Sequence, residues 1–148
     1  MSTQTLIVFV PGYATSREEY IDIAEYVRSL GHLFEFISIA NNNYGDRGCT
    51  TMDACIELSI ARYNLICTQA QYANTPIVLA GHSMGGLLVL RMVSISCFGR
   101  LHTKPTHAVS LNPSLAPVLS PLFPTIASFL PTVLLVLCMR TPPQCGDR

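Results

Sequence analysis

The stretch that most constrains the fold of this chain is Pro76–Gly86, with the sequence PIVLAGHSMGG. It opens with five apolar residues that favour β-structure, Pro76–Ala80, and continues into a short segment rich in glycine. A second apolar run begins at Leu87. A short apolar run bounded by glycine is typical of a buried strand, and the later run is typical of a helix. The stretch therefore predicts a strand, a sharp turn and a helix in direct succession.

Ser83 stands at the centre of that turn, in the pattern G-x-S-x-G. A serine hydroxyl is a weak nucleophile, and a tight strand-to-helix turn lifts it toward a base and a carbonyl group. Gly81 and Gly85 remove side chains that would clash across such a turn, and Gly86 lets the helix approach the sheet. The N–H of Met84 would point at a developing oxyanion. We expect a nucleophilic serine; the alternative is an ordinary helix-capping serine.

Length and composition exclude several kinds of partner. The chain has 148 residues, which indicates one domain over residues 1–148. Its formal net charge is zero and it lacks basic runs interleaved with aromatic residues, so nucleic-acid binding is not indicated. Hydrophobic residues make up 49% of the chain, which buried parallel strands would explain and a membrane segment would explain as well.

The cysteines and histidines show no metal-binding pattern. No two cysteines have C-x-x-C spacing, and none is clustered with histidine at zinc spacing, so we expect neither a metal nor a cofactor. Buried free thiols are the expected state of the cysteines. They are Cys49, Cys55, Cys67, Cys97, Cys138 and Cys145. The N-terminus has no basic region and its apolar run stops at Pro11-Gly12, so we expect no signal peptide and a cytoplasmic protein.

Apolar patterning predicts strands and helices in alternation. The expected strands are Thr5–Val10, Leu33–Ala40, Pro76–Ala80, Thr106–Leu111 and Thr132–Cys138. The expected helices are Ser16–Leu30, Thr50 to about Tyr72, and Met84–Phe98. This alternation predicts an α/β fold, with a parallel sheet of about five strands and helices on both faces. Active sites of such sheets lie at the carboxyl ends of the strands, which places the loop Pro11–Ser16 beside Ser83.

Two of these loops resemble those of the α/β-hydrolase superfamily of serine hydrolases. GHSMGG at Gly81–Gly86 resembles the lipase and esterase nucleophile elbow, and VFVPGYATS at Val8–Ser16 resembles the strand and oxyanion loop. THAVSLNPSLAP at Thr106–Pro117 is similar to the strand and Asn-Pro turn that follow the elbow helix in some small esterases. The resemblance covers Thr5–Pro117. It implies hydrolysis of a small-molecule carboxylic ester or acyl substrate through an acyl-enzyme on Ser83.

The resemblance also implies roles for neighbouring residues. The backbone amides of Tyr13 and Met84 would be the two oxyanion donors. Pro11 stands where the family usually has histidine. The oxyanion donor in this loop is a backbone N–H, so this change leaves it in place. His82 is the second residue of the elbow, where family geometry turns the side chain away from the serine.

The C-terminal part departs from the family pattern. In the family an acid follows the elbow and a histidine comes last, whereas here Asp147 is the only acid after Ser83 and no histidine follows it. Asp147 is the candidate acid, and no base is identified. A right-handed crossover places His102 and His107 at the opposite edge of the sheet, and His32 lies there too. We therefore expect a partial, truncated α/β-hydrolase fold without the C-terminal strand and histidine loop, and weak or no turnover.

Two other interpretations stay open. One is a non-catalytic pseudo-hydrolase remnant that binds an acyl ligand or a protein partner, and that self-associates through an exposed sheet edge. The other is a membrane-tethered fragment, because Leu122–Met139 has 18 residues without a charge, close to the length of a membrane span. Pro124, Pro131 and the strand pattern that follows count against a span. Residues 112–131 are expected to form an irregular, proline-rich, cap-like segment.

Overall fold

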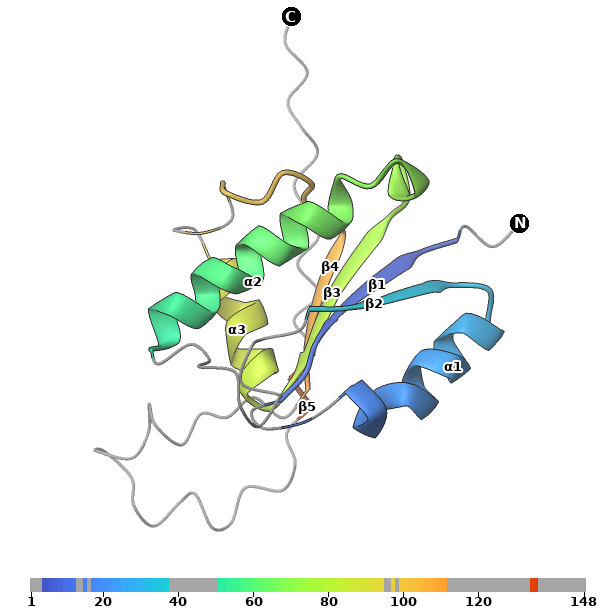
Figure 1. Cartoon of the computed structure of the whole chain (residues 1–148), viewed down its shortest axis with the longest axis horizontal. Helices are drawn as coiled ribbons and strands as arrows, with labels where there is room; N and C mark the ends of the chain where they lie inside the picture. The colour runs from blue at the N-terminus through green and yellow to red at the C-terminus, as the bar shows by residue number, and fades with distance from the viewer. Residues whose placement is uncertain are drawn as a thin grey trace, which may run out of the picture.

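Five strands form one sheet in the structure, a computed structural model that describes residues 4–12, 15, 17–37, 51–94, 97, 99–111 and 134–135 (Figure 1). The strands are β1 (Leu6–Val10), β2 (Leu33–Phe36), β3 (Ile77–His82), β4 (His107–Leu111) and β5 (Leu134–Leu135). Their order across the sheet is β2-β1-β3-β4-β5. Strands β1 to β4 are parallel to one another, which confirms the predicted α/β sheet.

The last strand differs from the expected parallel arrangement. β5 pairs with β4 in the antiparallel direction, and its two residues lie within the predicted strand Thr132–Cys138. An antiparallel neighbour needs no crossover helix to reach its place, whereas a parallel neighbour does. The described sheet is therefore a parallel sheet of four strands with a short antiparallel addition at one edge.

Helices cover both faces of the sheet, as predicted. They are η1 (Arg17–Tyr20), α1 (Ile21–Ser29), α2 (Met52–Cys67), η3 (Ala70–Tyr72) and α3 (Met84–Met92). Figure 1 shows α2 and α3 on one face and α1 on the other. The alternation of side chains along each strand divides the core accordingly, because successive residues point to opposite faces.

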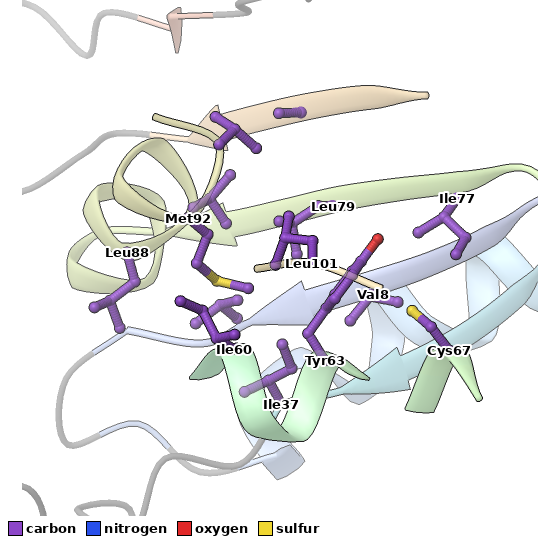
Figure 2. Packing of buried hydrophobic residues seen from close by; sticks show 14 of the residues in the cluster. Val8, Ile37, Ile60, Tyr63, Cys67, Ile77, Leu79, Leu88, Met92 and Leu101 are labelled. Carbon is purple, nitrogen blue, oxygen red and sulfur yellow. The ribbon is translucent and has the colours of Figure 1, made fainter. Parts of the chain in front are cut away.

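The larger part of the core lies between the sheet and the helices α2 and α3. In Figure 2, Ile60 and Tyr63 of α2 and Met92 of α3 point toward Val8 and Leu79 of the sheet. All five side chains are buried. The smaller cluster, on the opposite face beside α1, consists of Phe9, Tyr20, Ala24, Phe34 and Ala80. Strands β1 and β3 contribute to both clusters and are therefore the centre of the fold.

Helix ends follow local chemistry, with some shifts from the expected boundaries. Gly31 has φ 85° and its N–H donates to the Arg28 carbonyl at 2.9 Å, so it ends α1 as predicted. The α-helix itself begins at Ile21, because Arg17–Tyr20 forms a 3-10 turn first. The cap of α2 is Thr51, whose hydroxyl accepts from the Ala54 N–H at 3.2 Å.

The end of α3 was predicted too late in the sequence. The helix stops at Met92, not at Phe98. Beyond it the Ser94 N–H donates to the Arg91 carbonyl at 3.1 Å, and the Cys97 N–H donates to the Ser94 carbonyl at 3.0 Å. These short-range bonds interrupt the α-helical pattern after Met92, and Cys97 is helical again. The Ser94 hydroxyl also donates to the Arg91 carbonyl, at 2.6 Å, and so competes with continuation of the helix.

Several expectations concern the cysteines and the C-terminal segment. Cys55, Cys67 and Cys97 are buried thiols outside any disulfide, as predicted, while the remaining three cysteines lie outside the described residues. The cap-like segment 112–131 lies outside them too, as does most of 122–139. Within the part of the chain that is described, no helix combines the length and the apolar character needed to cross a membrane.

Candidate active site

The turn between β3 and α3 places Ser83 in an unusual backbone conformation. Ser83 has φ 55° and ψ −121° and precedes the first residue of α3. Residues with side chains rarely adopt this region, and it typically costs about 1–3 kcal/mol. Two hydrogen bonds hold it: the Ser83 N–H donates to the Leu111 carbonyl at 2.9 Å, and the Leu87 N–H donates to the Ser83 carbonyl at 3.2 Å. Strand β4 and helix α3 thus impose the conformation of Ser83.

Close approaches between backbone segments around Ser83 require glycine. A Cβ atom on Gly81 would lie 2.3 Å from the Gly85 carbonyl oxygen, and one on Gly85 would lie 2.0 Å from the Val10 carbonyl oxygen. A Cβ on Gly86 would lie 2.6 Å from the Ser110 hydroxyl oxygen. Since real Cβ atoms essentially never lie so close to backbone atoms, side chains at Gly81 and Gly85 would force the turn, α3 and β1 apart, whereas the Ser110 hydroxyl beside Gly86 can rotate away.

The loop after β1 meets this turn at Gly12. A Cβ on Gly12 would lie 3.4 Å from the Ser83 Cβ and 3.6 Å from the His82 Nδ1. The sheet register explains the contact, because Val10 and Gly81 are partners at the ends of β1 and β3. The structure therefore brings together the two loops that the sequence placed at the carboxyl edge of the sheet.

A buried tyrosine joins these two loops by hydrogen bonds. The Tyr20 hydroxyl accepts from the Gly12 N–H at 3.2 Å and lies 2.9 Å from the His82 Nδ1. The Thr15 hydroxyl donates to the Gly12 carbonyl at 2.8 Å and lies 3.4 Å from the Tyr20 hydroxyl. The His82 side chain is thus engaged on the α1 face of the sheet.

The other histidines lie at the opposite edge. The chain has four histidines, and all are described. His107 begins β4 and pairs with Val78, near the amino end of β3, and the exposed His102 precedes it. His32 directly precedes β2, and its Nδ1 accepts from the Thr5 N–H at 3.3 Å. The five-residue advance from Val78 to the serine corresponds to about 16 Å, so these histidines are not brought to Ser83.

A model of the Alpha/beta hydrolase family matches residues 7–143. This chain belongs to the alpha/beta hydrolase family. The match spans every strand that the structure describes except the first residue of β1, and it includes both loops of the candidate site.

A solved lipase structure shares the fold of this chain. A soluble variant of monoglyceride lipase from Saccharomyces cerevisiae, in complex with a substrate analogue, is 14% identical with a TM-score of 0.59, covering 89% of this chain and 46% of that one. An extracellular alpha/beta-hydrolase from a Paenibacillus species, reported to share structural and functional homology with tobacco salicylic acid binding protein 2, is 19% identical with a TM-score of 0.48, covering 60% and 34%. This chain therefore spans less than half of either protein. No curated protein matches it.

Not every residue predicted for this alpha/beta hydrolase site is described. Met84 is the first residue of α3 and half-buried, so its N–H belongs to the helix turn that has no internal acceptors. Tyr13 and Asp147 lie outside the described residues. Within the described ranges, no group of three or more His, Cys, Asp or Glu side chains could hold a metal ion.

Sequence reasoning missed the involvement of Tyr20 and Thr15. Tyr20 reads as one member of an apolar helical stripe, and nothing local reveals that its hydroxyl reaches a residue 62 positions away. The available signal was its place shortly after the loop of β1, where a tyrosine can bury its ring and still use its hydroxyl.

The buried thiol of Cys67 does not offer an alternative nucleophile in this alpha/beta hydrolase. Burial raises the pKa of Cys67 to about 11, although a hydrogen bond with Tyr63 partly opposes the effect. Burial also raises the pKa of Tyr63, whose hydroxyl donates to the Thr103 carbonyl at 2.9 Å. Because the thiolate is the reactive form of cysteine, Cys67 has a structural role at neutral pH.

Proposed function

We propose that this alpha/beta hydrolase chain carries a serine-hydrolase site for carboxylic esters, with Ser83 as the nucleophile. The observation that carries the proposal is the strained conformation of Ser83 at the start of α3, in the turn beside Gly12. Strain of this kind persists only where the surrounding structure enforces it, and it gathers at functional sites. The name of the monoglyceride lipase that shares the fold gives the substrate class to test first.

The proposed reaction is acyl transfer to Ser83. Its Oγ attacks the ester carbonyl carbon, the C–O bond to the alcohol breaks, and water later hydrolyses the acyl-enzyme. The N–H groups of Met84 and, by resemblance, Tyr13 would stabilise the oxyanion. Removing one such donor typically lowers kcat by about 10²–10³-fold.

The weak point of this site is the acceptor for the Ser83 proton. His82 is the one histidine at the carboxyl edge, and its Nδ1 already faces the Tyr20 hydroxyl. Asp147 stays a candidate acid, without a histidine for it to orient. Loss of the base from a catalytic triad lowers kcat by about 10⁶-fold, so we expect weak or no turnover from this chain.

A fluorophosphonate probe tests the nucleophile separately from turnover. In the labelling step a bond forms between Ser83 Oγ and phosphorus, the P–F bond breaks, and the serine proton passes to buffer. We expect one adduct, located at Ser83 by mass spectrometry and absent from Ser83→Ala. The control is Ser94→Ala, which removes a serine hydroxyl at the other end of α3 and should label normally.

Two results would contradict the proposal in different ways. A folded protein that forms no adduct at Ser83 would show that this serine is not activated as a nucleophile, and would favour the pseudo-hydrolase remnant. Rapid hydrolysis of p-nitrophenyl butyrate, abolished by Ser83→Ala, would instead show that the chain has a working base and that the expected inactivity is wrong.

The pseudo-hydrolase remnant is the second candidate function, and the position of the histidines favours it. Three of the four lie at the amino edge of the sheet, away from the serine. In this case the surface around Ser83 would bind an acyl ligand without cleaving it. A fatty acid would then protect the folded protein against heat, and Ser83→Ala would leave that protection unchanged.

A further inference from the structure

The Tyr20 hydroxyl oxygen contacts both loops of the candidate site. It accepts from the Gly12 N–H in the loop after β1, and it contacts the His82 Nδ1 at the end of β3. Gly12 in turn lies so near Ser83 that an added Cβ would be 3.4 Å from the Ser83 Cβ. The two loops are therefore joined by hydrogen bonds at Tyr20, and they lie close together at Gly12 and Ser83.

The hydrogen-bonding capacity of a hydroxyl fits this arrangement. A tyrosine hydroxyl donates one hydrogen bond and can accept from other groups. The Gly12 N–H can only donate, so it uses the acceptor side of the Tyr20 oxygen. The Tyr20 hydroxyl donates to the Thr15 oxygen at 3.4 Å and lies 2.9 Å from the His82 Nδ1. The tautomer of the imidazole sets which of Tyr20 and His82 donates in that contact.

Packing fixes where the hydroxyl lies. The Tyr20 side chain is 7% exposed, and its ring centroid lies 5.0 Å from that of Phe9 and 5.9 Å from that of His82. The Thr15 hydroxyl holds the carbonyl of Gly12 while Tyr20 holds its N–H. Gly12 has no side chain of its own to fix its orientation, so these two hydroxyls restrain its backbone on both sides.

We propose that Tyr20 is a positioning residue, which couples the oxyanion loop after β1 to the Ser83 turn through Gly12 and His82. This inference rests on the proposed function, because it assigns Tyr20 a role in the reaction of Ser83. Removing the Tyr20 hydroxyl would free the Gly12 peptide and leave a buried N–H without its acceptor. The loop would then present its backbone donor in a wider range of orientations.

The test compares Tyr20→Phe with a matched control, Tyr72→Phe. Tyr72 is also 7% exposed, and its hydroxyl donates to Glu35, away from the site. Both variants keep the aromatic ring and lose one hydroxyl. We expect Tyr20→Phe to slow fluorophosphonate labelling of Ser83 by about tenfold, the factor expected for one buried hydrogen bond, and Tyr72→Phe to label at the rate of the unchanged protein.

A spectroscopic readout separates coupling from packing. In Tyr20→Phe we expect hydrogen exchange of the Gly12 amide to speed up by about tenfold and the ¹⁵N resonance of His82 Nδ1 to shift. Unchanged exchange and an unchanged resonance would overturn the coupling. Equal slowing of labelling in both variants would overturn the role in positioning.

Failure of the proposed function would look different. If the unchanged protein formed no adduct at Ser83, the assignment of Ser83 as the nucleophile would be lost. The role of Tyr20 in that reaction would then be lost as well. The Gly12 exchange and His82 resonance would then decide whether Tyr20 still joins the two loops.

Discussion

The two ends of strand β3 solve a similar geometric problem by different means. Each end has a non-glycine residue with positive φ, Asn74 at 64° before the strand and Ser83 at 55° after it. Asparagine visits positive φ readily because its side chain bonds to the local backbone. Serine has less reason to do so, and the ψ of −121° places Ser83 outside the left-handed helical region. The carboxyl end of β3 is therefore the strained end.

The contacts around the two ends of β3 also differ in kind. Near the amino end, side chains tie loops together: the Asn64 amide donates to the Arg100 carbonyl at 3.0 Å, and the His102 N–H donates to the Asn64 oxygen at 2.9 Å. Near the carboxyl end, backbones approach so closely that only glycine fits at Gly81 and Gly85. The first kind of contact tolerates substitution and the second does not, so the backbone at the carboxyl end is held more tightly than that at the amino end.

The largest effect is expected from Gly85→Ala, which adds a side chain at the carboxyl end of β3. The new Cβ would lie 2.0 Å from one backbone oxygen and 2.4 Å from another, those of Val10 and Pro11. We expect a loss of about 3 kcal/mol or more in the free energy of unfolding, measured by urea denaturation. Gly99→Ala, where an added Cβ would have no described residue within 4 Å, is the matched control and should change stability by less than about 0.5 kcal/mol. Equal stability of the two variants would mean that the close approach is absent.

Ser83→Gly should move stability in the opposite direction. Glycine adopts positive φ without strain, so we expect a gain of about 1 kcal/mol in the free energy of unfolding, together with complete loss of probe labelling. Asn74→Gly should gain only a few tenths, about 0.3 kcal/mol, because asparagine is less strained. A destabilised Ser83→Gly would contradict the strain at this end of the strand.

A smaller effect is expected at the amino edge, where Arg100 forms an ion pair with Glu57 of α2. Hydrogen bonding to Arg100 lowers the pKa of Glu57 below its ordinary value of 4.5. A lowered folded-state pKa means that the pair adds stability above that ordinary value and loses it as the pH falls through the folded-state pKa. Both side chains are exposed, so the contribution is small and sensitive to salt.

Glu57→Gln measures this contribution. We expect its Tm to lie slightly below that of the unchanged protein at pH 7 in low salt, and the difference to vanish at pH 3. Thermal denaturation followed by circular dichroism at the two pH values checks it. A difference of equal size at pH 3 would show that Glu57 acts through packing rather than through its charge.

The smallest effect concerns the two exposed histidines of the amino edge. We expect His102→Ala and His107→Ala to label Ser83 within about twofold of the unchanged protein, because exposed side chains far from a site have little influence on it. A tenfold decrease in the labelling rate of either variant would contradict this difference between the two ends of β3, since it would place a functional base at the amino end.

Much of the fold could be predicted because the apolar pattern is local and strong. The strands β1 and β3 are short apolar runs between helix-like segments, and the G-x-S-x-G spacing placed the turn at Ser83 correctly. The stop of α1 at Gly31 was equally predictable, because positive φ at a helix end favours glycine. These features depend on a few neighbouring residues.

The parts that could not be predicted depend on distant contacts. Apolar residues recur at helical spacing along α1, yet Ile23 is 47% exposed and Leu30 57%, because only the side of the helix near Ala24 meets the sheet. The hydrogen bond between Tyr20 and His82 likewise exists only after β1 and β3 have paired. Neither feature has a signature within a short window of sequence.

The pairing of β1 with β3 also decides when the site can form during folding. Val10 and Gly81 are partners in the sheet but lie about seventy residues apart in the chain. Closing so long a loop reduces chain entropy before any contact at its ends is gained, and non-local pairing of this kind folds slowly. During refolding, β3 and α3 are joined directly and can form together, while Gly12 reaches Ser83 only when the centre of the sheet closes. Recovery of probe labelling should therefore lag behind recovery of helical circular dichroism.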